Sequence, residues 1–212
     1  CEKTFLPRVV GGKDHLQTVK HFVCMTVPDE EVRAQIPNVI VDDDIVDEVS
    51  DEFEWPELDE NTPASLCYTS GTTGNHKGVL YTNRSTVLHS FGISLPDSLN
   101  LSAQDIVLPV VPMFHANAWG LPYAAAMIGA SLVLPGPNLD GHSLANMIDD
   151  YKVNVAVGVP TIWQTLLAAA KETGTKLPSL KRNVVGGSAC PSSMIKTFRD
   201  EFGCETLHAW GM

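Results

Sequence analysis

Glycine, hydroxyl and lysine side chains are concentrated in one short stretch of this sequence. Residues 68–78 read Tyr-Thr-Ser-Gly-Thr-Thr-Gly-Asn-His-Lys-Gly and follow a strand expected over Ala64–Tyr68. Glycines let the backbone turn tightly and expose N–H groups. Serine and threonine hydroxyls can donate to phosphate oxygens, and a lysine supplies a mobile positive charge. This combination predicts a loop that binds a polyphosphate.

Two well-known phosphate loops are excluded by spacing. In a Walker A loop the lysine precedes Ser or Thr, but here Lys77 precedes Gly78, and the first glycine is at the wrong distance. No G-x-G-x-x-G occurs anywhere, so the dinucleotide fingerprint is absent as well. A polar surface turn is the ordinary alternative for any stretch rich in Gly, Ser and Thr.

The apolar pattern around this loop predicts alternating strands and helices. After a helix that begins near Asn83, a buried helix is expected over Asn117–Ala130, and Gly203 is expected to end the last helix. Strands are expected at Ile106–Val111 (at an edge or bulge, given Pro109), Ser131–Leu134, Val153–Val157, Arg182–Val185 and Glu205–Ala209. This order predicts an α/β fold, a mainly parallel sheet with helices on both faces. Ligands of such sheets bind beyond the carboxyl ends of the strands.

Composition narrows the class of protein. The chain has 212 residues, of which 44% are hydrophobic and 18% charged, so a disordered tail or a charge-rich coiled coil is excluded. Its formal net charge of −11 argues against a nucleic-acid partner, which would require a basic face. The longest apolar stretches are too short to form a transmembrane segment.

The acidic residues are unevenly distributed. Residues 42–60 hold eleven of the 25 acidic side chains and no Lys or Arg, which predicts a solvated acidic connector. A calcium-binding loop is excluded, because the sixth position, Asp47, would have to be glycine. We expect two regions: an N-terminal portion over 1–61 that contains the connector, and a regular core over 62–212.

The cysteines predict free thiols in a reducing compartment. The chain has five cysteines, which is an odd number, and they are widely spaced, with no C-x-x-C motif. They are Cys1, Cys24, Cys67, Cys190 and Cys204. We therefore expect neither a disulfide framework nor a zinc site, and we expect a cytoplasmic location. No oriented histidine base accompanies Cys190, so a nucleophilic role is not expected for its thiol.

Four blocks of the sequence resemble the adenylate-forming (AMP-binding) superfamily of acyl-CoA synthetases, luciferases and peptide-synthetase adenylation domains. They resemble its phosphate loop (Tyr68–Val79), its acyl-site block (Pro112–Gly120), its adenine-site block (Val185–Pro191) and the start of its aromatic-Gly-x-Thr-Glu motif (His208–Met212). The Asn-Ala-Trp-Gly-Leu-Pro-Tyr wording of residues 117–123 is most similar to medium- and long-chain fatty-acid–CoA ligases. The resemblance is strong over 62–212 and weak over 1–61.

The resemblance implies a two-step ligase reaction on small-molecule substrates. A fatty acid carboxylate attacks the α-phosphate of ATP, assisted by Mg²⁺, and gives acyl-adenylate and pyrophosphate. The thiolate of coenzyme A then displaces AMP and forms the thioester. Short-chain and aryl carboxylates are alternative substrates for the same chemistry. A homodimer is a further implication of the family.

The resemblance also implies roles for individual residues. Lys77 and His115 are the expected catalytic residues, with His115 near the carboxylate, and Thr69 is the expected Mg²⁺ ligand. The β- and γ-phosphates are assigned to Thr69, Ser70, Gly71, Thr72, Thr73, Gly74 and Lys77. The adenine is assigned to Gly187, Ser188 and Ala189 on one side and to His208, Ala209, Trp210 and Gly211 on the other. Trp119 is expected between the nucleotide and the acyl tunnel.

Two features depart from the family pattern. His76 replaces the proline that usually precedes the loop lysine, which predicts a weaker or more mobile loop and modestly tighter ATP binding after His76→Pro. The sequence starts at Cys1 and stops at Met212, before the expected Thr-Glu, so we interpret it as part of an N-terminal domain without the mobile C-terminal domain. The alternative function is a non-catalytic nucleotide- or acyl-binding fragment or degenerate homologue.

Overall fold

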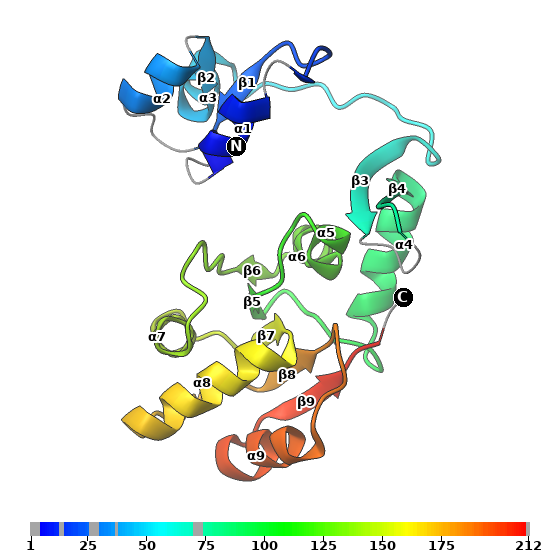
Figure 1. Cartoon of the computed structure of the whole chain (residues 1–212). Coiled ribbons are helices and arrows are strands. Elements are labelled where there is room, and N and C mark those ends of the chain that lie inside the picture. Colours follow the sequence, from blue (N-terminus) through cyan, green and yellow to red (C-terminus); the bar gives the residue numbers. More distant parts are fainter. Residues whose placement is uncertain (1–4, 13–14, 26–29, 37, 70–73, 211–212) are drawn as a thin grey trace. The chain divides into compact units, whose positions relative to one another are not determined.

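The chain folds as two compact units, Cys1–Glu57 and Leu58–Met212 (Figure 1). The computed structural model describes residues 5–12, 15–25, 30–36, 38–69 and 74–210. No helix in these ranges is both long enough and apolar enough to cross a membrane.

The N-terminal unit is small and mixed. Its elements are α1 (Leu6–Gly12), β1 (Phe22–Cys24), α2 (Glu30–Gln35), β2 (Val39–Val41) and α3 (Asp42–Glu48). The two strands pair in parallel, and Cys24 and Ile36 form a small buried cluster beside them. The acidic stretch is helical at its start rather than a connector throughout. Asp42, Asp43 and Asp44 occupy the first turn of α3, where the helix dipole favours negative charge.

The second unit contains a five-stranded parallel sheet. Its strands are β5 (Ile106–Pro109), β6 (Ser131–Leu132), β7 (Val155–Gly158), β8 (Arg182–Val185) and β9 (Glu205–His208), in the order β6-β5-β7-β8-β9. The prediction of an edge or a bulge at Pro109 is wrong, because β5 lies between β6 and β7 and pairs with β7 without a register shift. Proline is tolerated there because β6 pairs with β5 only as far as Val107.

Helices cover both faces of this sheet, as predicted (Figure 1). The helices are α4 (Asn83–Ser94), α5 (Ala116–Trp119), α6 (Leu121–Ile128), α7 (Gly141–Asp150), α8 (Pro160–Thr173) and α9 (Ser192–Phe202). Leu108 packs in the cluster formed by α7, α8 and α9, whereas its neighbour Val107 packs in the cluster that contains α6. Successive strand residues point to opposite faces, so each strand contributes to both cores.

Local sequence signals set the helix ends. Thr82 and Ser85 form a capping box at the start of α4. Asp140 accepts backbone hydrogen bonds at the start of α7, and Gly203 ends α9 in the left-handed conformation, as predicted. Of the single helix expected over Asn117–Ala130, only α6 is a right-handed helix; the residues of α5 have left-handed backbone, and this turn ends at Gly120.

A buried polar network joins the amino ends of β5, β7 and β8. Asp105 is only 4% exposed and lies just before β5. Its carboxylate accepts Arg182 Nη2 at 2.6 Å, Asn154 Nδ2 at 2.8 Å and the Ser102 backbone N–H at 2.7 Å. The same guanidinium donates through Nη1 to the Leu99 carbonyl at 2.7 Å. These bonds hold three strands in register at the end of the sheet away from the predicted ligands.

Candidate functional site

A separate hairpin carries the predicted phosphate loop. β3 (Pro63–Thr69) and β4 (Lys77–Thr82) pair antiparallel, and Thr69 is directly opposite Lys77. His76 Nδ1 lies 3.2 Å from the Thr69 carbonyl oxygen, a contact across the mouth of the hairpin that proline could not make. Gly74 has φ +118°, which L residues rarely adopt. The other predicted phosphate ligands, Ser70, Gly71, Thr72 and Thr73, lie outside the described residues.

The acyl-site block follows the carboxyl end of β5 and contains an unusual turn. His115 is exposed and precedes α5, whose Ala116, Asn117, Ala118 and Trp119 all have positive φ, between 46° and 56°. Gly120 continues the run at φ 77°. Left-handed backbone costs an L residue roughly 1–2 kcal/mol, so four non-glycine residues in this conformation require support from their surroundings.

Side chains from β3 and α4 supply that support. Asn117 Nδ2 donates to Ser65 Oγ at 2.8 Å, and Asn117 Oδ1 accepts from Cys67 Sγ at 3.3 Å. On the other side, His89 Nε2 lies 3.0 Å from the Trp119 carbonyl oxygen. The turn is thus joined to the strand that leads into the phosphate loop and to the helix that follows it.

The Trp119 indole packs against the adenine-site block. Gly186, which follows β8, is buried, and a Cβ there would lie 2.6 Å from Trp119 Cη2 and 3.0 Å from Cζ3. Gly187 has φ +78°, and its Cβ would lie 3.0 Å from Val159 Cγ1. Both glycines are therefore required by close packing or backbone conformation, and the contact of Gly186 with Trp119 brings the acyl-site and adenine-site blocks together.

The carboxyl end of β9 adds the remaining predicted adenine residues. Because β8 and β9 are neighbouring parallel strands, their carboxyl ends meet at one edge. His208 Nε2 accepts the Cys190 backbone N–H at 3.3 Å, and the Ala209 N–H donates to the Val185 carbonyl at 2.8 Å. Trp210 is 83% exposed.

Several of the predicted nucleotide residues are accessible. Ser188 and Ala189 are exposed, like Gly187 before them, whereas Gly211 lies outside the described residues. Partial burial raises the pKa of the Cys190 thiol, the opposite of what an activated nucleophile requires. In the described part of the chain, no cluster of three His, Cys, Asp or Glu side chains could hold a metal ion.

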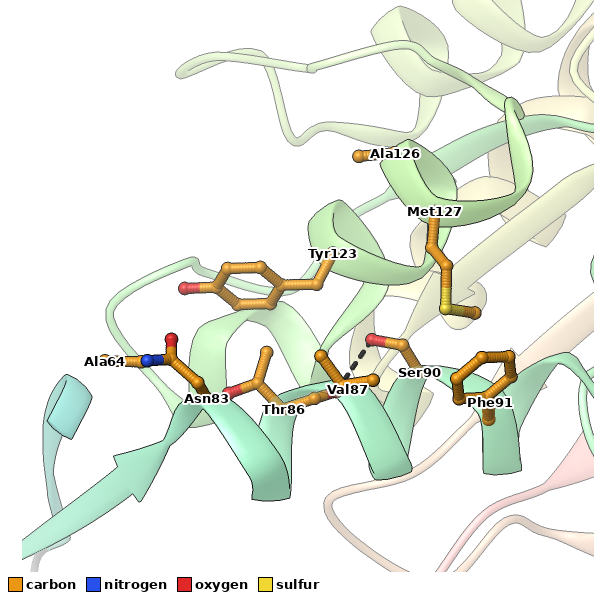
Figure 2. A pocket seen from close by; sticks show the side chains of 9 residues that line it. All are labelled: Ala64, Asn83, Thr86, Val87, Ser90, Phe91, Tyr123, Ala126 and Met127. Atoms are coloured by element: carbon orange, nitrogen blue, oxygen red, sulfur yellow. Dashed lines mark hydrogen bonds between the residues drawn. The ribbon is translucent and has the colours of Figure 1, made fainter. Parts of the chain in front are cut away.

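An apolar groove lies beside the turn, between α4 and α6. It has a volume of about 390 Å³, and its lining comprises Ala64, Asn83, Thr86, Val87, Ser90, Phe91, Tyr123, Ala126 and Met127. Figure 2 shows Tyr123 and Met127 reaching from α6 toward α4. Among the polar side chains of the lining, the Ser90 hydroxyl donates to the Thr86 carbonyl at 2.8 Å and so has a partner within its own helix.

Sequence reasoning missed the groove and the supports of the turn. The sequence predicts a helix beginning near Asn83, and the spacing of Thr86, Val87, Ser90 and Phe91 along it was the available signal for one lining surface. Ser65 and Cys67 gave no signal, because their partner Asn117 is 52 and 50 residues away in the sequence.

Comparisons with known proteins show the family and the fold. A model of the AMP-binding enzyme family matches residues 6–212. The chain is 58% identical over 211 residues to the 3-methylmercaptopropionyl-CoA ligase of Ruegeria lacuscaerulensis and 56% identical over 211 residues to the medium-chain-fatty-acid–CoA ligase of Ectopseudomonas oleovorans. Each alignment covers 100% of this chain and 39% of the relative.

A solved structure has the same fold. The crystal structure of the anthranilate CoA ligase AuaEII in complex with anthranoyl-AMP matches with a TM-score of 0.84 and 21% identity, over 100% of this chain and 40% of that one. Together with the family match over residues 6–212, these relatives establish that the chain belongs to the AMP-binding enzyme family.

Proposed function

We propose that the protein carrying this chain activates a carboxylic acid with ATP and transfers the acyl group to coenzyme A. The observation that carries the proposal is the left-handed turn. Through Asn117 it is joined to the strand of the phosphate loop, and through Trp119 it packs on Gly186 of the adenine-site block. Three segments that are distant in sequence thus form one site, and both named relatives are CoA ligases.

In the first step the carboxylate oxygen forms a bond to the α-phosphorus, and the bond to the pyrophosphate oxygen breaks. Such a reaction needs positioning and charge stabilisation more than a protein nucleophile. Lys77 and Gly74, together with residues 70–73, are proposed to hold the β- and γ-phosphates. Lys77 is exposed at the hairpin mouth, where its ammonium can balance the charge that develops on pyrophosphate. His115 is proposed to lie near the carboxylate.

The adenine is proposed to lie between two exposed segments. Gly187, Ser188 and Ala189 form one side, and the segment His208–Trp210 forms the other. Exposure of the Trp210 ring supports a stacking role, because an aromatic face is available to a base.

Thr69 fits magnesium only as one of several ligands. Its hydroxyl is a hard oxygen donor, but among the described residues no acidic cluster accompanies it. Phosphate oxygens of the nucleotide and water would supply further oxygen ligands. When bound, Mg²⁺ would neutralise phosphate charge.

In the second step the thiolate sulfur of coenzyme A bonds to the acyl carbon and AMP leaves with the bonding electrons. Among the described cysteines, Cys67, Cys190 and Cys204 are free thiols, which supports the proposed cytoplasmic location. A homodimer stays a prediction.

The proposed acid is aliphatic. An apolar groove beside the turn supports a hydrocarbon tail, and one relative is named for medium-chain fatty acids. A second candidate is a short thioether acid, because the 58% identical relative is named for 3-methylmercaptopropionate. The two candidates differ in length rather than in chemistry.

Pyrophosphate release by the intact protein tests the proposal. With ATP, Mg²⁺ and a series of acids from 3-methylmercaptopropionate to long-chain fatty acids, we expect release that depends on the acid and falls sharply in Lys77→Ala. Acyl-CoA should then appear when coenzyme A is added. Tight ATP binding without release for any acid would instead indicate the alternative, a non-catalytic binding module.

A further inference from the structure

Asn117 combines an unfavourable backbone with a fully engaged side chain. Its φ is 52°, a conformation that asparagine tolerates better than most residues. Both ends of its amide are bonded to β3, with Nδ2 donating to Ser65 Oγ and Oδ1 accepting from Cys67 Sγ. Either feature alone could explain why asparagine occupies this position.

The face of β3 that Asn117 contacts leads to the nucleotide site. Side chains alternate along a strand, so Ser65, Cys67 and Thr69 lie on one face, and Thr69 is the last residue of β3 and part of the proposed phosphate loop. Cys67 is only 6% exposed, which shields its bond to the amide from water.

The other side of the turn leads to the carboxylate site. Two residues beyond Asn117, the Trp119 carbonyl contacts His89, and the indole packs on Gly186. Asn117 therefore lies between the strand that carries the phosphate loop and the side chain that separates the two proposed pockets.

We propose that Asn117 is a positioning residue whose amide fixes the turn to β3, so that the phosphate loop and the carboxylate entrance keep one relative position. The inference rests on the function proposed above. Without the amide, the strained turn can relax, and Trp119 moves relative to the loop. The acid would then meet the α-phosphate in poor alignment, although ATP itself still binds.

A pair of substitutions in the intact protein separates the two explanations. Asn117→Gly removes the amide but suits positive φ, whereas Asn117→Ala removes the amide and keeps the strain. We expect both to lower kcat/KM for the acid by about tenfold, as two net hydrogen bonds imply, with little change in the KM for ATP. The matched control is Asn100→Gly, since Asn100 has φ 51° before β5 and is exposed.

A wild-type kcat/KM for the acid in Asn117→Gly would overturn the inference and leave asparagine with a backbone role only.

Ser65→Ala provides a second test that leaves the turn sequence intact and decides the matter if the Asn117 variants fail to fold. It should lower the same quantity by about threefold, the equivalent of one hydrogen bond, and add nothing to Asn117→Gly. An unchanged value in Ser65→Ala counts against the tether. If the wild-type protein releases no pyrophosphate with any acid, the proposed function fails before any variant is compared.

Discussion

Gly186→Ala is the substitution that most directly tests the packing of the site. The added methyl carbon would lie 2.6 Å from Trp119 Cη2, 3.0 Å from Cζ3 and 3.3 Å from Cζ2. Carbon atoms are in favourable contact at about 3.5–4.0 Å, so the indole has to move by roughly 1 Å. His89 contacts the Trp119 carbonyl, which limits how far the backbone can follow.

The expected cost follows from that displacement. Inserting a methyl group into a packed region lowers the free energy of unfolding by about 1–3 kcal/mol. A shift of 1 Å in a group that positions the substrate can reduce turnover by about 100-fold. We therefore expect Gly186→Ala to lose both stability and acid-dependent pyrophosphate release.

Urea unfolding followed by circular dichroism and a pyrophosphate assay measure the two effects. Adding Trp119→Phe to Gly186→Ala should recover most of the lost stability, because the smaller ring lacks the atoms that clash. Gly92→Ala is the matched control: nothing lies within 4 Å of its Cβ position in α4, so it should stabilise the protein by about 1 kcal/mol. An unchanged unfolding midpoint and unchanged turnover in Gly186→Ala would refute the described contact.

Three further substitutions test other features. Gly141→Ala should lower the free energy of unfolding by about 3 kcal/mol in a urea titration, because its Cβ would lie 2.1 Å from a backbone carbonyl oxygen of α8. A loss below about 1 kcal/mol would contradict the close contact between the two helices. Asp105→Ala should lower the free energy of unfolding by about 3–5 kcal/mol in the same titration, because the Arg182 guanidinium would stay buried without its carboxylate partner. An unchanged unfolding midpoint would show that the ion pair is dispensable. Burial raises the pKa of the Cys204 thiol from 9.0 to about 12, so the folded state keeps a proton that the unfolded chain loses. The stability that the buried neutral thiol provides is complete below pH 9 and is lost as the pH rises from 9 through 12. Compared with Cys204→Ala, the wild type should lose about 1.4 kcal/mol of its free energy of unfolding by pH 10. Stability profiles that run parallel with pH in the two proteins would argue against the buried thiol.

Much of the sheet was predictable from the sequence, because its strands are short apolar runs between turn residues. β8 has the predicted bounds, and every residue of β7 is buried, as expected for a strand covered on both faces. Gly203 was predictable as a helix end because only glycine adopts the left-handed conformation there without cost.

The break at Gly120 shows where periodicity fails. Residues 117–130 are mostly apolar, so apolar and polar positions do not alternate with the period of a helix. The hydrophobic pattern therefore cannot show where a helix begins or breaks in this stretch. Gly120 followed by Pro122 was the available signal, since proline is favoured in the first turn of a new helix. The contacts of Asn117 with β3 were beyond prediction, because hydrogen bonds between residues about 50 apart leave no local pattern.

The Asp105–Arg182 network has an evolutionary consequence. It fastens the strands at their amino ends, whereas Gly186 and Trp119 lie past their carboxyl ends. Side chains past the carboxyl ends of the strands can therefore be exchanged without loosening the scaffold. Two relatives that are each more than half identical to this chain are named for different acids, and such a separation in this chain would be compatible with that variety.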